Sequence, residues 1–97
     1  MNKKEIMKIV RMNRTILEKY KVQSLALFGS YVRNEQKKSS DIDMLVKFRE
    51  PTYDNYVGLR RELQNLFHRK IDLVNITALK DKIRPHILKE AEWLKAA

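Results

Sequence analysis

Hydrophobic positions recur at two spacings along this chain of 97 residues, and the spacing separates helices from strands. Apolar residues three and four positions apart predict amphipathic helices over 3–20, 51–67 and 81–95. Short apolar or alternating runs predict strands over 25–28, 41–48 and 70–75. Helices and strands therefore alternate along the chain, which predicts an α/β (α+β) fold.

The first predicted strand stops at a Gly-Ser pair. Gly29 lacks a Cβ, so its backbone can turn sharply and approach a ligand closely. Ser30 then stands where a short helix would begin, and a hydroxyl group beside free backbone N–H groups is suited to hold a phosphate. A Gly-Ser pair alone is also a common turn, so its meaning depends on the residues that come after it in the chain.

Carboxylates lie on the next two predicted strands. Asp41 and Asp43 are two positions apart, so both project from one side of the sheet while Ile42 and Met44 point into a core. Asp72 lies between Ile71 and Leu73 and would point the same way on the third strand. Each carboxylate alone could be a solvated surface charge. Together they offer the oxygen ligands that Mg²⁺ prefers, and a third carboxylate could accept a proton from an attacking hydroxyl group.

In this order and spacing the residues Gly29, Ser30, Asp41, Asp43 and Asp72 resemble the signature of the minimal nucleotidyltransferases of the DNA polymerase beta superfamily. That signature is GSx10DxD followed by a later strand carboxylate. The resemblance implies a nucleotidyltransferase fold, in which a small mixed sheet has helices packed on one face and the carboxylate site on the other. It covers nearly the whole chain and implies a single domain over residues 1–97.

The same resemblance implies roles for these residues. ATP would be the substrate and Mg²⁺, as two ions, the cofactor, with Asp41, Asp43 and Asp72 as metal ligands and Asp72 also as the base. Gly29 and Ser30 would bind the nucleotide. Many family members carry an Arg-Gly pair in the sequence GSxxRG, and here Arg33 fits while Asn34 stands in place of the glycine.

Stand-alone members of the family work with a partner protein. The resemblance implies a HEPN-domain ribonuclease toxin, encoded next to this chain, as the acceptor of AMP on a tyrosine, so that the chain acts as its antitoxin. Two alternatives are an antitoxin that neutralises its partner by binding alone and a nucleic-acid-binding module. Transfer to a small molecule is weakened as an alternative, because the chain has no second domain to build an acceptor pocket.

The net charge of +9 bears on the choice of partner. The basic residues are spread over the first predicted helix, Arg60 and Arg61, and the segment 80–89. No recognised nucleic-acid-binding motif or row of aromatic residues accompanies them, which favours an acidic protein partner over specific nucleic-acid binding. Nonspecific attraction to nucleic acid is the other interpretation. The absence of cysteine and of any apolar run near 20 residues predicts a cytoplasmic protein that does not enter a membrane.

Other polar and aromatic residues carry weaker signals. The polar segment 35–40 is interpreted as a mobile loop over the site that serves as a solvated connector; the alternative is that Lys37 or Lys38 helps to hold triphosphate or an acidic acceptor. His68 and His86 lack a second histidine at metal-ligand spacing and are predicted to lie at a helix end or on a helix surface. Tyr31 and Trp93 are predicted to pack or to contact a partner.

Overall fold

Four strands form one sheet in the computed structural model, which describes residues 1–96. The strand order is β3-β2-β1-β4. The elements are α1 (Lys3–Met12), α2 (Arg14–Lys19), β1 (Val22–Phe28), η1 (Gly29–Tyr31), β2 (Ile42–Phe48), α3 (Tyr53–Phe67), β3 (Ile71–Asn75), η2 (Ile76–Ala78), α4 (Arg84–Glu90) and β4 (Glu92–Lys95), where η marks a short 3-10 helix.

The sheet is mixed, as the sequence predicts. β1 runs antiparallel to β2 and to β4, whereas β2 and β3 are parallel. Parallel neighbours need a long crossover connection, and α3 supplies it between β2 and β3. This crossover brings the carboxyl-bearing strands side by side.

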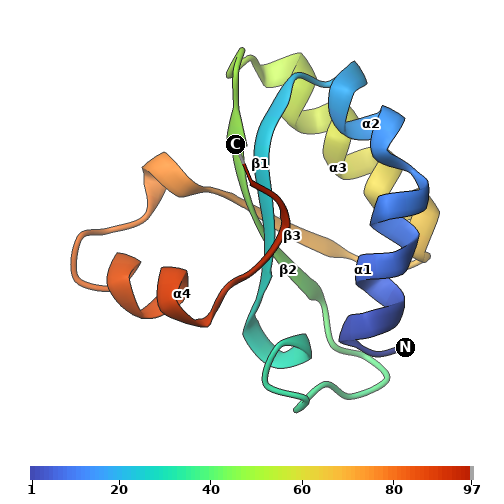
Figure 1. Cartoon of the computed structure of the whole chain (residues 1–97), viewed down its shortest axis with the longest axis vertical. Coiled ribbons are helices and arrows are strands. Elements are labelled where there is room, and N and C mark those ends of the chain that lie inside the picture. The colour runs from blue at the N-terminus through green and yellow to red at the C-terminus, as the bar shows by residue number, and fades with distance from the viewer. Residues whose placement is uncertain (97) are drawn as a thin grey trace.

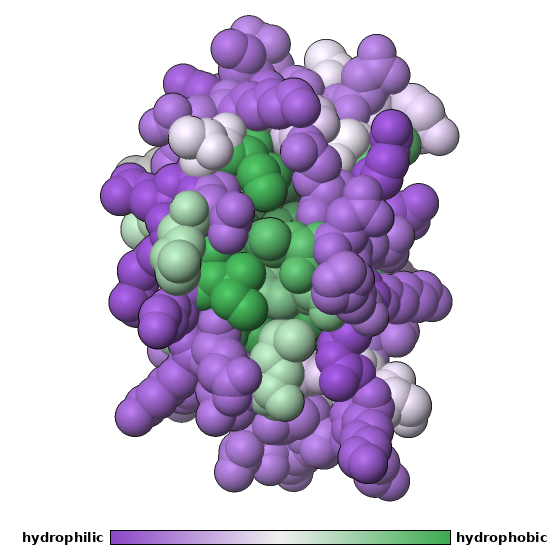
Figure 2. Space-filling model, turned by 90° about the vertical axis from the view of Figure 1, so that its right-hand side faces the viewer, coloured by the Kyte–Doolittle hydropathy of each residue, from purple (hydrophilic) through white to green (hydrophobic). Residues whose placement is uncertain are grey.

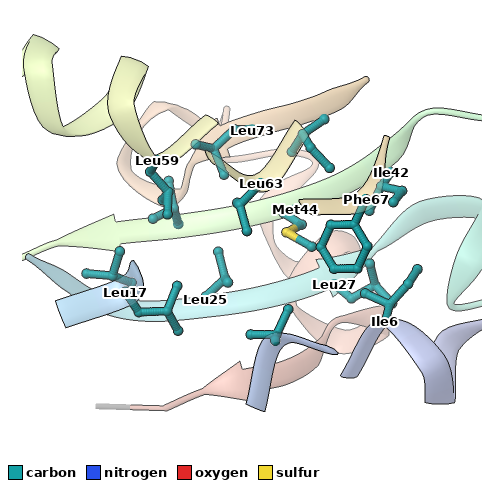
Figure 3. Close-up of a cluster of buried hydrophobic side chains, with 14 of the residues drawn as sticks. Ile6, Leu17, Leu25, Leu27, Ile42, Met44, Leu59, Leu63, Phe67 and Leu73 are labelled. Carbon is teal, nitrogen blue, oxygen red and sulfur yellow. The ribbon is translucent and has the colours of Figure 1, made fainter. Parts of the chain in front are cut away.

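One face of the sheet is covered by α1, α2 and α3 (Figure 1). The main core lies between these helices and the sheet, and Figure 3 shows its side chains pointing toward one another from both layers. Alternate residues of each strand enter this core, such as Leu25 and Leu27 of β1 and Ile42 and Met44 of β2. The residues between them, Asp43 included, therefore face away from the three helices.

A smaller cluster lies on the opposite face of the sheet. Ala26, Leu45 and Leu79 are buried there, and Ile87 and Leu88 of α4 pack against them. Figure 1 shows α4 on the side of the sheet away from the other helices. The carboxylate face is thus partly covered by the segment that comes after β3.

The predicted helix over 3–20 is wrong in one respect, because two helices meet at Asn13. The Asn13 side chain donates to the Ile9 carbonyl at 2.8 Å, and its backbone N–H donates to Val10. A side-chain amide that bonds to the nearby backbone competes with the helical hydrogen-bond ladder. The chain therefore changes direction before α2 begins.

The predicted helix over 81–95 is also wrong. It is helical only over α4, and the chain then extends into β4, whose Trp93 lies opposite Ala26 of β1. Without β4, β1 would be an edge strand with unpaired backbone groups. The backbone pairing with β1 outweighs the helical spacing of the apolar residues in this segment.

The outer surface of the helical layer is mainly hydrophilic. Figure 2 shows a hydrophobic area at its centre, framed by hydrophilic side chains. Partly buried side chains from these helices, such as Ile9, Ile16 and Leu66, pack against the main core. Within residues 1–96, no helix combines the length and the apolar character that crossing a membrane requires.

Candidate active site

Asp43 and Asp72 are direct neighbours across the parallel strands β2 and β3. Their side chains project from the face that the long helices leave free, because the residues on either side of each enter the main core. The sequence placed each carboxylate on this face. The strand register brings the two together.

Gly29 closes the site from the end of β1. Its φ of +79° lies in the left-handed region that favours glycine. A Cβ at this position would collide with the Asp43 carboxylate and lie 3.1 Å from its Cγ. Glycine is therefore required for both its conformation and its lack of a side chain, and the Gly29 backbone lies directly against Asp43.

The environment of Asp43 raises its pKa from 3.8 to about 6. Burial is the largest cause, followed by the Asp72 carboxylate, which repels the ionised form and hydrogen-bonds to the protonated one, and by the charge of Asp41. The Arg33 charge partly opposes the rise. An ionised pair at this position favours a bound cation, which would take the place of the proton.

Asp41 lies one residue before β2 and, like Asp43, is partly buried. Its carboxylate is 3.8 Å from Lys70 Nζ. Among residues 1–96, no three histidine, cysteine or acidic side chains form a group that could enclose a metal ion. The structure thus brings Asp43 and Asp72 together, with Asp41 near enough to influence the Asp43 pKa but paired with a lysine.

The carboxylate oxygens of Asp43 and Asp72 fit a hard divalent cation such as Mg²⁺. Asp43 is partly buried and has the exposed Asp72 beside it, so burial first and repulsion by Asp72 second raise the pKa of Asp43. Mg²⁺ is commonly held by one or two carboxylates together with substrate phosphates and water. Asp43 and Asp72 supply the protein part of such a set.

Ser30 comes directly after Gly29 within η1, and its carbonyl accepts a hydrogen bond from the Glu35 backbone N–H at 2.9 Å. Asn34 adopts a left-handed backbone conformation, with a φ of +59°. Asparagine tolerates that conformation better than most residues, which accounts for its occurrence where the GSxxRG sequence has glycine. The turn after β1 is therefore held by its own backbone.

Two charged residues complete the surroundings of Gly29. The Gly29 backbone N–H donates to Glu90 Oε1 at 2.8 Å, and Arg33 Nη1 donates to both carboxylate oxygens of Glu90, at 2.8 and 3.0 Å. Arg33 Nε also donates to Glu35 at 2.6 Å. Glu35 and Glu90 together raise the pKa of Arg33 above its ordinary value. The sequence analysis noted Arg33 but missed Glu90, because a single glutamate on a distant helix carries no pattern.

The segment 35–40 is held by local and tertiary bonds. Ser40 Oγ accepts from the Lys37 backbone N–H at 2.8 Å, and the Arg69 guanidinium donates to the Lys38 carbonyl. Lys37, Lys38 and Arg69 line a shallow recess together with Tyr31. The segment is thus a connector with a basic edge.

The predictions for the histidines and for Tyr31 are confirmed. His68 ends α3 in the left-handed conformation, and His86 is an exposed residue of α4. Tyr31 is buried in the main core. Trp93 lies on β4 and is 42% exposed.

Comparisons with known proteins place the chain in a family. Residues 12–96 match the family described as polymerase beta, nucleotidyltransferase. The chain therefore belongs to the nucleotidyltransferases of this family, as its motif predicts.

Relatives with similar sequences cover nearly the same length. One is the provisionally named protein adenylyltransferase MJ0128 of Methanocaldococcus jannaschii, which is 49% identical over 91% of this chain and 89% of its own. Another is protein adenylyltransferase MntA of Thermococcus cleftensis, which is 36% identical over 84% of this chain and 83% of its own.

Solved structures show the same fold. A structure provisionally described as a minimal nucleotidyltransferase has a TM-score of 0.76 and 27% identity, covering 95% of both chains. A complex of a tri-AMPylated Shewanella oneidensis HEPN toxin with an MNT antitoxin has a TM-score of 0.68 at 19% identity, covering 95% of this chain and 73% of the other. The second similarity establishes the shared fold alone.

Proposed function

We propose that this chain is an Mg²⁺-dependent protein adenylyltransferase that moves AMP from ATP to a tyrosine hydroxyl group of a HEPN-type partner and so acts as its antitoxin. The observation that carries the proposal is the placement of Gly29 against Asp43, with Asp72 beside it in register. The names of the relatives support a protein as the acceptor of AMP, and the AMPylated HEPN toxin bound to a protein of the same fold motivates the choice of a HEPN-type partner.

The chain supplies binding groups and a base for this reaction. The acceptor oxygen would form a bond to the α-phosphorus of ATP, while the bond from that phosphorus to the bridging oxygen breaks and pyrophosphate leaves. Asp72 would take the proton of the tyrosine, whose ordinary pKa near 10 leaves it protonated at neutral pH. Gly29 and Ser30 would hold the phosphates of the nucleotide.

Asp43 and Asp72 would hold the Mg²⁺ ions, with Asp41 joining them if it leaves Lys70. Bound Mg²⁺ would neutralise charge on the triphosphate and stabilise the leaving oxygen. In this proposal the partner itself would position the acceptor tyrosine next to the carboxylates. This division of labour fits a protein acceptor better than a small molecule.

The direct test is transfer to the partner. Wild type, Asp43→Asn and Asp72→Asn are each incubated with ATP, Mg²⁺ and the protein encoded next to this chain, and the partner is weighed by intact mass spectrometry. Wild type is expected to add one or more AMP groups, and both variants to lose transfer by orders of magnitude. Asp54→Asn, which removes an exposed carboxylate on α3, is the matched control and should retain transfer.

A binding-only antitoxin is the second candidate, and one observation favours it: Asp41 is paired with Lys70, and no complete three-ligand group forms within residues 1–96. In that case wild type would add no mass to the partner. Wild type and the two variants would also neutralise the partner equally. That combination of results would refute the enzymatic proposal.

A further inference from the structure

The Glu90 carboxylate lies on the same groups that an incoming phosphate would use. One of its oxygens accepts hydrogen bonds from both the Gly29 backbone N–H and Arg33 Nη1, each at 2.8 Å. The other oxygen accepts from Arg33 Nη1 at 3.0 Å. These contacts span 61 and 57 positions of sequence, so they are made by the tertiary fold.

A backbone N–H beside a guanidinium group is a good binding site for an anionic oxygen. Charge-assisted hydrogen bonds of this kind are made to carboxylates and to phosphates alike. A single N–H directed at one acceptor cannot bond a second acceptor at full strength. A phosphate oxygen at this position must therefore replace the Glu90 oxygen.

The position of these donors connects them to the proposed reaction. Gly29 lies directly against the Asp43 carboxylate, and the charge of Arg33 acts on the same carboxylate. A triphosphate bound near Asp43 and Asp72 would bring its own oxygens to the Gly29 N–H. This step rests on the proposed function.

We propose that Glu90 is an internal competitor for the nucleotide phosphates, and that it sets the nucleotide affinity of the site by occupying the Gly29 N–H and the Arg33 guanidinium group until ATP displaces it.

The surroundings of Glu90 allow it to leave without disturbing the core. It is the last residue of α4, a helix of seven residues in which no residue is fully buried. Arg33 keeps its second partner, Glu35, when Glu90 moves away. The guanidinium group would then remain close to the site and bind the phosphate in place of Glu90.

The opposite role makes the opposite prediction. If Glu90 served to position Gly29 and Arg33 for the nucleotide, its removal would weaken nucleotide binding. If it competes, its removal strengthens binding. Because Arg33 is half exposed, solvent reduces the effect, and we expect a gain of about three- to tenfold in affinity.

The test compares Glu90→Gln and Glu90→Ala with wild type by calorimetric titration of AMP-PNP with Mg²⁺. Both variants should bind more tightly, and the alanine variant most of all, because a glutamine oxygen can still accept from the Gly29 N–H. Glu92→Gln is the matched control. It removes a carboxylate on β4 that pairs with Lys3 of α1 at 3.0 Å, and the affinity of this variant for AMP-PNP should equal that of wild type. Thermal unfolding verifies that each variant is folded.

A second probe separates this inference from the proposed function. Inorganic triphosphate is titrated without metal while the amide signal of Gly29 is followed by NMR. The signal should respond at lower triphosphate concentrations in the Glu90 variants than in wild type. If it does so in a protein that never transfers nucleotide, the proposed function fails and this inference stands.

Equal or weaker binding of both probes by the folded Glu90 variants would overturn the inference, even if nucleotide transfer to the partner is observed. An unresponsive Gly29 signal in all three proteins would overturn it as well. In either case Glu90 would be a positioning residue or a surface ion-pair partner.

Discussion

Replacing Asp43 by asparagine should make the metal-free protein more stable while it abolishes transfer. The ionised Asp43 carboxylate is partly buried beside Asp72, which raises its pKa from 3.8 to about 6. Folding therefore disfavours the ionised form. Asparagine keeps the shape of the side chain and removes the charge that causes this penalty.

The size of the effect can be derived from the pKa. A rise from 3.8 to about 6 corresponds to at most about 3 kcal/mol when the carboxylate is ionised in both states. The Asp43 side chain is only partly buried, so solvent screening reduces this to about 1–2 kcal/mol. In a domain of this size, such a gain raises the melting temperature by roughly 5–10 °C.

The pH dependence has a definite sign. Because the pKa is raised in the folded state, the destabilisation by Asp43 is absent below about pH 4, grows between pH 4 and 6, and is complete above pH 6. The advantage of Asp43→Asn should therefore be large at pH 7 and mostly lost at pH 4.

Urea unfolding with EDTA, at pH 7 and at pH 4, measures the gain in stability and its dependence on pH. Asp54→Asn is the control, because this exposed carboxylate lies in the first turn of α3 and its loss should leave stability unchanged or slightly lower. The reasoning is refuted if Asp43→Asn is no more stable than wild type at pH 7. It is also refuted if the gain is equally large at pH 4.

Three further results are expected at the same site and on the surface. Calorimetry should detect ATP binding with Mg²⁺ but only weak binding in EDTA, and equal affinity in EDTA would refute the metal-bridged site. The metal-dependent affinity for ATP should also fall as the pH drops below about 6, because the cation competes with the proton on Asp43. Gly29→Ala should destabilise the protein by about 1–3 kcal/mol in thermal unfolding, since alanine is strained at a φ of +79° and its Cβ meets Asp43. Ser30→Ala should stay folded and bind nucleotide more weakly, and an unchanged nucleotide affinity in this variant would mean that the Gly-Ser pair is only a turn. Duplex DNA and RNA should bind weakly, without sequence preference, and lose affinity steeply as salt rises, because the net charge of +9 attracts phosphates nonspecifically. Tight, sequence-dependent binding near physiological salt would instead favour a nucleic-acid-binding module.

The sequence alone determined those features of the site that depend on neighbouring residues. Alternation along a strand is a local property of the backbone, so the direction of Asp43 and Asp72 could be predicted from the apolar residues beside them. The left-handed conformation that favours glycine after β1 is local in the same way, because it belongs to a single residue, whereas the lack of space for a Cβ beside Asp43 is set by the tertiary structure. The motif built from these residues was specific enough to identify the family.

The tertiary structure decided what depends on residues far apart in the sequence. The register of β2 and β3 sets Asp43 beside Asp72, and burial there raises the Asp43 pKa. Local spacing also predicted a helix where β4 forms. The strand forms because it pairs with the backbone groups of β1, which are distant in the sequence and leave no trace in the local spacing. The hydrogen bond between Glu90 and the Gly29 backbone N–H likewise joins residues that only the tertiary fold brings together. Pairings of this kind are set by how the elements pack together, and the periodicity of a single segment does not encode them.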